Sequence, residues 1–276
     1  MSPESRPAPT SAVRRRSSSG ARRGTPLLAS LHRIEAIARH NVVLRLRDPG
    51  QVITYLALPM ILMLVLAPLY ESAVDGGVTA VVTGMIILFS VFVVGVAGNA
   101  VLNERQWRTW DRLRQTRATP LEMALGKLLP LYLIMGAQQA VLVVYGCAVI
   151  GAPWPRSPGL LVLTVAVWSF ALLALGTALA TVARSLGELS AVKDVGAMVL
   201  GSMAGALVPL ALMPAWAQAA AHASPGFYAL RMLQASFTGD SDTVLVDTTV
   251  LVVLGGLLIT LAVRRLARGW GRATLL

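Results

Sequence analysis

Two long runs without a charged residue, separated by one basic loop, constrain this chain more than any other feature. Residues 76–103 and residues 128–155 contain no Asp, Glu, Lys or Arg, whereas the segment between them is rich in arginine. A helix of ~20 apolar residues crosses a lipid bilayer. Both runs are long enough, so the sequence predicts two membrane-spanning helices joined by a loop at the membrane surface.

The composition extends this prediction to the whole chain. Of the 276 residues, 55% are hydrophobic and only 13% are charged, against ~25% charged residues in soluble domains. This balance indicates an integral membrane protein, and it argues against a nucleic-acid-binding protein despite the net charge of +11. We therefore predict an all-α membrane protein with six transmembrane helices, at about residues 51–70, 78–101, 128–150, 159–183, 195–213 and 243–263.

The positive charges predict the orientation of these spans. If both termini lie inside, 22 of the 24 Lys and Arg residues fall on the cytoplasmic side, and only Arg156 and Arg231 fall outside. Loops on the cytoplasmic side of membrane proteins are enriched in Lys and Arg. The sequence therefore predicts that both termini are cytoplasmic.

The loop between the second and third predicted spans has a helical pattern. Trp107, Trp110 and Leu113 recur at helical spacing, while Arg108 and Arg112 point elsewhere. A soluble partner could transmit force to the membrane spans through an amphipathic helix over residues 104–117. We therefore predict a cytoplasmic coupling helix. Its candidate coupling residues are Glu104, Arg105, Trp107, Arg108, Trp110, Asp111 and Arg112. The alternative is that these arginines only enforce topology and bind lipid headgroups.

Two further segments have their own character. Residues 1–27 are rich in Arg, Ser, Pro and Gly and predict a disordered basic cytoplasmic tail, whereas residues 28–46 predict an amphipathic helix on the inner membrane surface. The transmembrane domain then covers residues 28–276.

Between the fifth and sixth spans the chain stays apolar, but Pro209, Pro214 and Pro225 prevent one continuous helix. This pattern predicts short re-entrant helices.

Motifs for catalysis and metal binding are missing from the sequence. It contains no phosphate-binding loop, its three histidines are scattered, and Cys147 is its only cysteine. We therefore predict no catalytic residue, no metal site and no cofactor bound by this chain. Asn99, Gln138 and Gln139 lie within predicted spans, where polar side chains most often form hydrogen bonds between helices.

Three stretches resemble one family of membrane proteins. They are Arg45–Gly50 with Leu58-Pro59, then Asn103–Arg114 continuing through Ala118-Thr-Pro-Leu and Gly126-Lys127, and finally Gly205–Pro209 with Met213–Trp216 and Ser224–Tyr228. In this order they resemble the ABC-2 type permeases of ABC exporters, in particular the daunorubicin-resistance type. One departure is Glu104-Arg-Gln-Trp-Arg-Thr109, where the family commonly has Glu-Arg-Glu-x-Gly-Thr.

The resemblance implies a permease subunit in the bacterial plasma membrane that exports an amphiphilic drug or natural product, as in antibiotic resistance. It also implies a cytoplasmic ABC ATPase that binds ATP and Mg, and a second permease subunit, identical or related. The substrate route would follow the second and fifth spans at the subunit interface. Its candidate residues are Phe89, Phe92, Asn99, Met198, Ser202 and Met203. Ordinary helix packing is the alternative for each of them, and the alternatives for the whole chain are export of a lipid-linked polysaccharide or lipid and a non-transporting membrane assembly factor.

Overall fold

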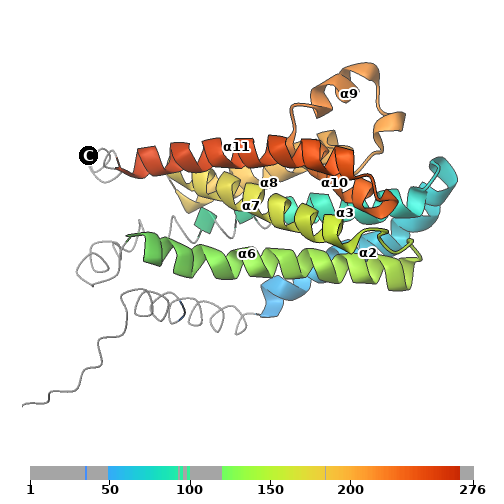
Figure 1. The fold of residues 1–276 in the computed structure, drawn as a ribbon, viewed down its shortest axis with the longest axis horizontal. Coiled ribbons are helices and arrows are strands. Elements are labelled where there is room, and N and C mark those ends of the chain that lie inside the picture. The colour runs from blue at the N-terminus through green and yellow to red at the C-terminus, as the bar shows by residue number, and fades with distance from the viewer. Residues whose placement is uncertain are drawn as a thin grey trace, which may run out of the picture.

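A computed structural model describes residue 35 and residues 49–92, 94–95, 98–99, 120–183 and 185–267. Within these ranges the chain is helical and contains no strand (Figure 1). The elements in order are α2 (Pro49–Ala73), α3 (Gly77–Phe92), α6 (Pro120–Tyr145), the π-helix η1 (Gly146–Ile150), α7 (Pro158–Val182), α8 (Leu186–Met203), the 3-10 turn η2 (Leu210–Leu212), α9 (Ala215–Ala221), α10 (Pro225–Thr238) and α11 (Ser241–Ala267).

Four helical stretches among the described residues are long and apolar enough to cross a membrane. They are Tyr55–Ala73, Leu128–Ile150, Pro158–Val182 and Ser241–Arg265. These stretches correspond to the first, third, fourth and sixth predicted spans. The second predicted span appears as the shorter apolar helix Gly77–Phe92, and helical backbone recurs at residues 94–95 and 98–99.

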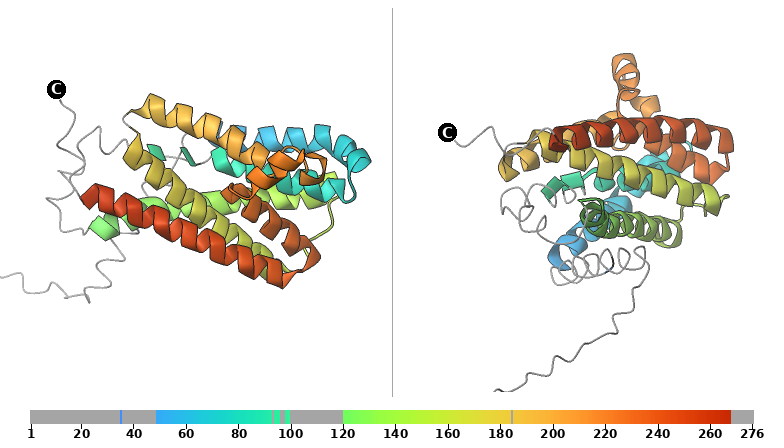
Figure 2. Two further views of the ribbon diagram at one scale, coloured as in Figure 1. Left: turned by 90° about the horizontal axis from the view of Figure 1, so that it is seen from above. Right: turned by 60° about the vertical axis from the view of Figure 1, so that its left-hand side comes forward.

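Helix α3 forms the centre of the bundle. Every residue from Val81 to Val91 is buried, because α2, α6, α8 and α10 all pack against it. Helix α11 packs most extensively on α7, as the view from above shows (Figure 2). The core is therefore a central helix surrounded by α2, α6, α8 and α10, which agrees with the uncharged and largely apolar sequence of residues 78–92.

Buried polar side chains join the helices at defined points. Gln138 Nε2 donates to the Tyr55 carbonyl at 3.2 Å, and Gln139 Nε2 donates to Ser169 Oγ at 3.0 Å. Trp168 Nε1 donates to Ser90 Oγ at 2.6 Å and so links α7 to α3. The two glutamines thus connect α6 to α2 and α7, which confirms the prediction that they form hydrogen bonds between helices.

Helix α8 differs from the predicted fifth span. It begins at Leu186, because the Ser185 side chain accepts a hydrogen bond from the Glu188 amide at 3.1 Å, and it ends at Met203. Beyond it, Gly205 has a φ of +87°, a left-handed conformation that favours glycine. The limits of α8 therefore differ from the predicted limits 195–213 by nine residues at the start and ten at the end.

The segment between α8 and α11 contains the predicted short helices. α9 projects from the side of the bundle, whereas α10 returns to it and buries one face against α11, α7 and α3 (Figure 1). The Ser224 hydroxyl donates to the Leu200 carbonyl at 3.0 Å, and the Tyr70 hydroxyl donates to the Leu207 carbonyl. These bonds tie the start of α10 to α8 and the end of α2 to the segment after α8.

Asp240 caps the start of α11. Its carboxylate accepts from the Thr243 hydroxyl at 2.6 Å and from the backbone amides of Asp242 and Thr243. These hydrogen bonds, that of the Thr243 hydroxyl first, hold the pKa of Asp240 below its usual value. The last turn of α11 carries Arg264 and Arg265, which suits the negative end of a helix dipole.

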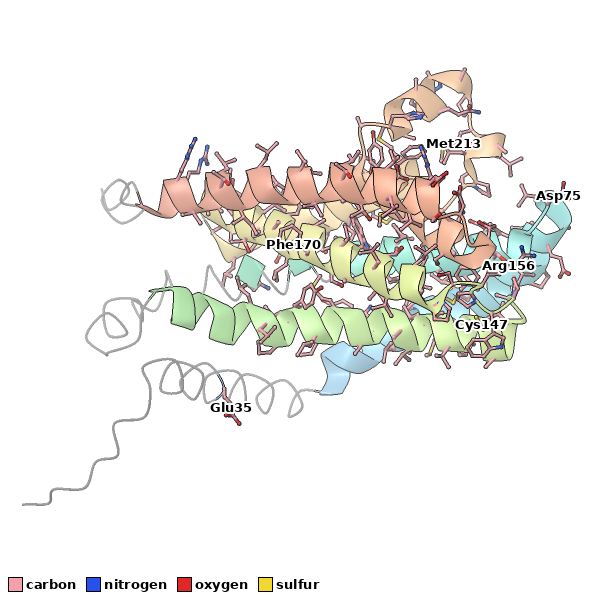
Figure 3. The ribbon with its side chains drawn as sticks, in the orientation of Figure 1. Glu35, Asp75, Cys147, Arg156, Phe170 and Met213 are labelled. Atoms are coloured by element: carbon pink, nitrogen blue, oxygen red, sulfur yellow. The ribbon has the colours of Figure 1, made fainter. Side chains whose placement is uncertain are left out.

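Several predicted features lie outside the described residues. They are the tail at 1–27, the surface helix at 28–46 apart from Glu35, and the coupling helix at 104–117. Glu35 itself is helical and exposed (Figure 3).

Candidate functional site

Helices α3 and α8 run antiparallel in close contact through glycine. A Cβ atom added to Gly84 would lie 2.2 Å from the Ala206 carbonyl oxygen, and one added to Gly201 would lie 2.3 Å from Leu88 Cδ1. Further along, a Cβ at Gly98 would lie 3.0 Å from Leu189 Cδ2. The predicted substrate route lies along these two helices, so their contact is the candidate site.

The six predicted route residues occupy different faces of this helix pair. Phe89 is only 6% exposed and belongs to the core, where its ring lies 5.8 Å from that of the partly buried Phe92. Met198 is 52% exposed, and Ser202 and Met203 are partly buried in the last turn of α8. The six side chains therefore do not line one pocket within the single described chain.

Lys193 is the charged residue of this contact, and the sequence prediction placed it in a loop. It lies in the second turn of α8, on the same face as Leu189 and Ala197, which are each 1% exposed. The Lys193 side chain is itself 15% exposed. Its ammonium lies 3.0 Å from the carboxylate of Asp194, whose side chain is 55% exposed.

Asn99 brings a second polar group to the same region. Its Oδ1 atom is buried and meets no hydrogen-bond donor among the described residues. Asn99 follows Gly95 by four residues, and helical backbone is present at both positions. A Cβ at Gly95 would lie 1.9 Å from Lys193 Cδ, so the lysine stem lies directly against the chain at this glycine, beyond the end of α3.

A second charged pair joins α10 to α11. Arg231 Nε lies 3.2 Å from Oδ2 of Asp247 without the alignment of a hydrogen bond, and the Asp247 side chain is 1% exposed. The guanidinium carbon also lies 5.4 Å from the centre of the Phe227 ring. Charge attraction and a cation–π contact therefore hold Arg231 against the two helices.

Surface cavities lie elsewhere. An apolar groove of about 330 Å³ opens between α6 and α7, lined by residues that include Tyr132, Gly136, Ala140 and Val165. It contains none of the six predicted route residues. No group of three or more His, Cys, Asp or Glu side chains that could hold a metal is found in the described ranges.

The seven predicted coupling residues fall outside the described residues, so their placement stays a prediction. Lys193 and the Arg231–Asp247 pair are the residues that sequence reasoning missed. Ser185-Leu-Gly-Glu188 has the spacing of a helix-capping box, which would have started α8 before Lys193. No comparable sequence signal pairs Arg231 with Asp247.

Comparison with known proteins gives two findings. The ABC-2 type transporter family matches residues 32–238. The inner membrane transport permease YhhJ of Escherichia coli K12 is 27% identical over 209 residues, which cover 74% of this chain and 54% of that permease, and the protein of the same name from Shigella flexneri gives the same values. This chain thus spans about half the length of these relatives.

Proposed function

Because the chain belongs to the ABC-2 type transporter family, whose membrane domain carries no ATPase site, we propose that it is the permease subunit of an ABC exporter. In this proposal a separate cytoplasmic ABC ATPase hydrolyses ATP, and the permease moves an amphiphilic drug or natural product out of a bacterial cell. The observation that carries the proposal is the family match over residues 32–238 on a bundle of apolar helices.

The proposed arrangement has six spans with both termini in the cytoplasm, two permease subunits and two ATPase subunits. The turn between α2 and α3, which carries Asp75, and the segment before α7, which carries Arg156, then lie outside, and Figure 3 places these two residues toward the same end of the bundle. The substrate would move along α8 at the subunit interface. The outward-facing Met198 supports this route, together with its exposed neighbours Val195 and Val199.

Transport in membrane vesicles tests the proposal. Inside-out vesicles that contain the chain and the ABC ATPase that copurifies with it are expected to accumulate a lipophilic fluorescent drug when ATP is added. Accumulation should disappear when the phosphate-loop lysine of the ATPase is replaced. Equal accumulation with the active and the inactive ATPase would refute the export proposal.

The purified chain alone is expected to release no phosphate from ATP, because it has no phosphate-binding loop. The measurement is phosphate release with and without the partner ATPase. ATP turnover by the chain alone that survives removal of contaminating ATPases would contradict this prediction.

Charge reversal in the loop at 103–127 tests its coupling role. Arg108→Glu together with Arg112→Glu is expected to leave a normally inserted permease whose ATPase no longer drives export, because these side chains would meet the ATPase. The matched control is Arg114→Glu with Arg117→Glu. It changes the loop charge by the same amount, but these two positions would share a helical face with Trp107 and Trp110. If both pairs lower export only in proportion to the inserted protein, the arginines serve topology alone.

A further inference from the structure

Helix α2 contains a buried proline that leaves one backbone carbonyl without its usual partner. Pro59 lies inside α2, and its side chain is buried. Proline has no amide hydrogen, so it cannot donate to the carbonyl four residues earlier in an α-helix. That carbonyl belongs to Tyr55. Because an unpaired carbonyl is costly in apolar surroundings, a neighbouring helix has to supply the missing donor.

Gln138 of α6 supplies this donor. Its Nε2 donates to the Tyr55 carbonyl at 3.2 Å, and the glutamine is buried. Seven residues further along α6, the Tyr145 hydroxyl donates to the Met60 carbonyl at 3.3 Å. Positions seven apart lie two turns apart on the same face of a helix. One face of α6 therefore holds α2 on both sides of Pro59.

The two halves of α2 are held differently. In the second half, residues 60–73, Met63 and Tyr70 belong to the core, and the Tyr70 hydroxyl donates to the Leu207 carbonyl beyond α8. In the first half, residues 49–58, none of the side chains described, at 55–58, is buried. Among the described residues, this half receives one side-chain hydrogen bond from another helix, that of Gln138. Pro59 thus separates a fixed half from a lightly held half.

We propose that Pro59 is a hinge in α2 and that Gln138 is the latch that holds it. When α6 moves away from the Tyr55 carbonyl, the first half of α2 pivots about Pro59, because helices bend most readily at proline. The use of this hinge in transport rests on the export function proposed above. Helix α6 begins at Pro120, within the predicted coupling loop, so force on that loop would reach Gln138 along one helix.

Distances between spin labels on the full chain in nanodiscs test the hinge. One pair of labels joins position 51, in the first half of α2, to position 182 at the end of α7. A second pair joins position 69, in the second half of α2, to position 162 near the start of α7. Cys147, the only cysteine, is replaced by alanine so that the labels attach only where intended. Each pair is expected to give one narrow distance distribution in the chain that is otherwise unchanged.

Three variants make this test specific. Gln138→Leu should raise the population of the pivoted conformation, seen only by the first pair, about three- to tenfold, the range for one hydrogen bond between membrane helices. Gln139→Leu is the matched control and should change neither pair, because Gln139 donates to Ser169 of α7. Pro59→Ala restores an amide hydrogen for the Tyr55 carbonyl, so Gln138→Leu should have no effect on the distances in that background.

Transport separates the hinge from its use. Pro59→Ala is expected to insert normally and to lower ATP-driven accumulation in the vesicles several-fold, because a continuous α2 resists the pivot. The matched control is Pro68→Ala, the same replacement in the second half of α2 at an exposed proline, which should retain accumulation.

Each outcome decides the inference. Unchanged distances in Gln138→Leu, or equal changes in Gln138→Leu and Gln139→Leu, overturn the hinge. An effect of Gln138→Leu that persists beside Pro59→Ala also overturns it, because the glutamine then acts independently of the proline. Full accumulation with Pro59→Ala, or equal losses with Pro59→Ala and Pro68→Ala, refutes the role of the hinge in export. If the unchanged chain transports nothing, the export proposal fails, whereas the distances still decide whether α2 is hinged.

Discussion

Replacing Arg231 with methionine is expected to lower the free energy of unfolding by about 3–5 kcal/mol. The reason is the Asp247 carboxylate, which is 1% exposed and has Arg231 as its ion-pair partner at 3.2 Å. Without the guanidinium, a carboxylate that is almost fully buried loses its ion-pair partner. The measurement is the unfolding free energy, or the thermal midpoint of the chain in one fixed detergent.

Two variants make this test specific. Arg231→Met combined with Asp247→Leu should recover most of the lost stability, because removing both partners of a buried pair is often neutral. Arg156→Met removes the other arginine predicted to lie outside, which is exposed, and should change stability by less than ~0.5 kcal/mol. A mild effect of Arg231→Met, equal to that of Arg156→Met, would contradict the prediction.

Alanine at position 84 is expected to destabilise the chain by about 1–3 kcal/mol or more. The added Cβ would lie 2.2 Å from the Ala206 carbonyl oxygen and 3.0 Å from its carbonyl carbon. These atoms belong to the backbone of the turn after α8, so no flexible side chain can move aside. Helix α3 and this turn must separate, which loosens the contact that contains the candidate site.

The matched control is Gly196→Ala in the middle of α8, where an added Cβ would meet nothing within 4 Å. It is expected to be neutral or slightly stabilising, because alanine is the better helix former by about 1 kcal/mol. Thermal midpoints of the two variants in the same detergent give the comparison. Equal midpoints would show that the contact between α3 and the turn adapts to a methyl group.

The sequence predicted the long apolar helices well, because their pattern is a property of each segment alone. Residues 128–150 and 159–183 carry no charge and are bounded by prolines or charged residues, and apolar helical stretches lie at Leu128–Ile150 and Pro158–Val182, although α6 itself begins at Pro120. The short helices α9 and α10 were also predicted, since Pro214 and Pro225 restrict where a helix can begin.

Helix α8 was predicted less well because its helix cap and its hydrophobicity indicate different first residues. Hydrophobicity alone starts a span after Asp194, where the charges end, whereas the Ser185 cap starts the helix nine residues earlier. At its other end, the apolar residues 204–213 look like a continuing span, but the left-handed Gly205 ends the helix. Hydrophobicity reports where a segment can reside, and caps and backbone angles report where a helix stops.

The candidate site could be predicted only in part. The sequence predicted that the second and fifth spans line the substrate route. Which side chains of a span face inward depends on where the helix begins, and the predicted start of the fifth span left Lys193 outside it. The pairing of Arg231 with Asp247 depends on how α10 folds back against α11, which no local pattern encodes. Contacts between segments are therefore the part that required the structure.

The position of α10 also constrains how the chain is made in the cell. Its buried residues pack against α3, α7 and α8, which are synthesised before it, and against α11, which is synthesised after it. While α11 is still being synthesised, α10 lacks one of the helices against which it packs, and Arg231 lacks its ion-pair partner Asp247. The bundle can therefore close only once the C-terminal helix has emerged. Chains that stall before Asp247 should expose an unfinished apolar face to the membrane proteases that degrade incomplete proteins.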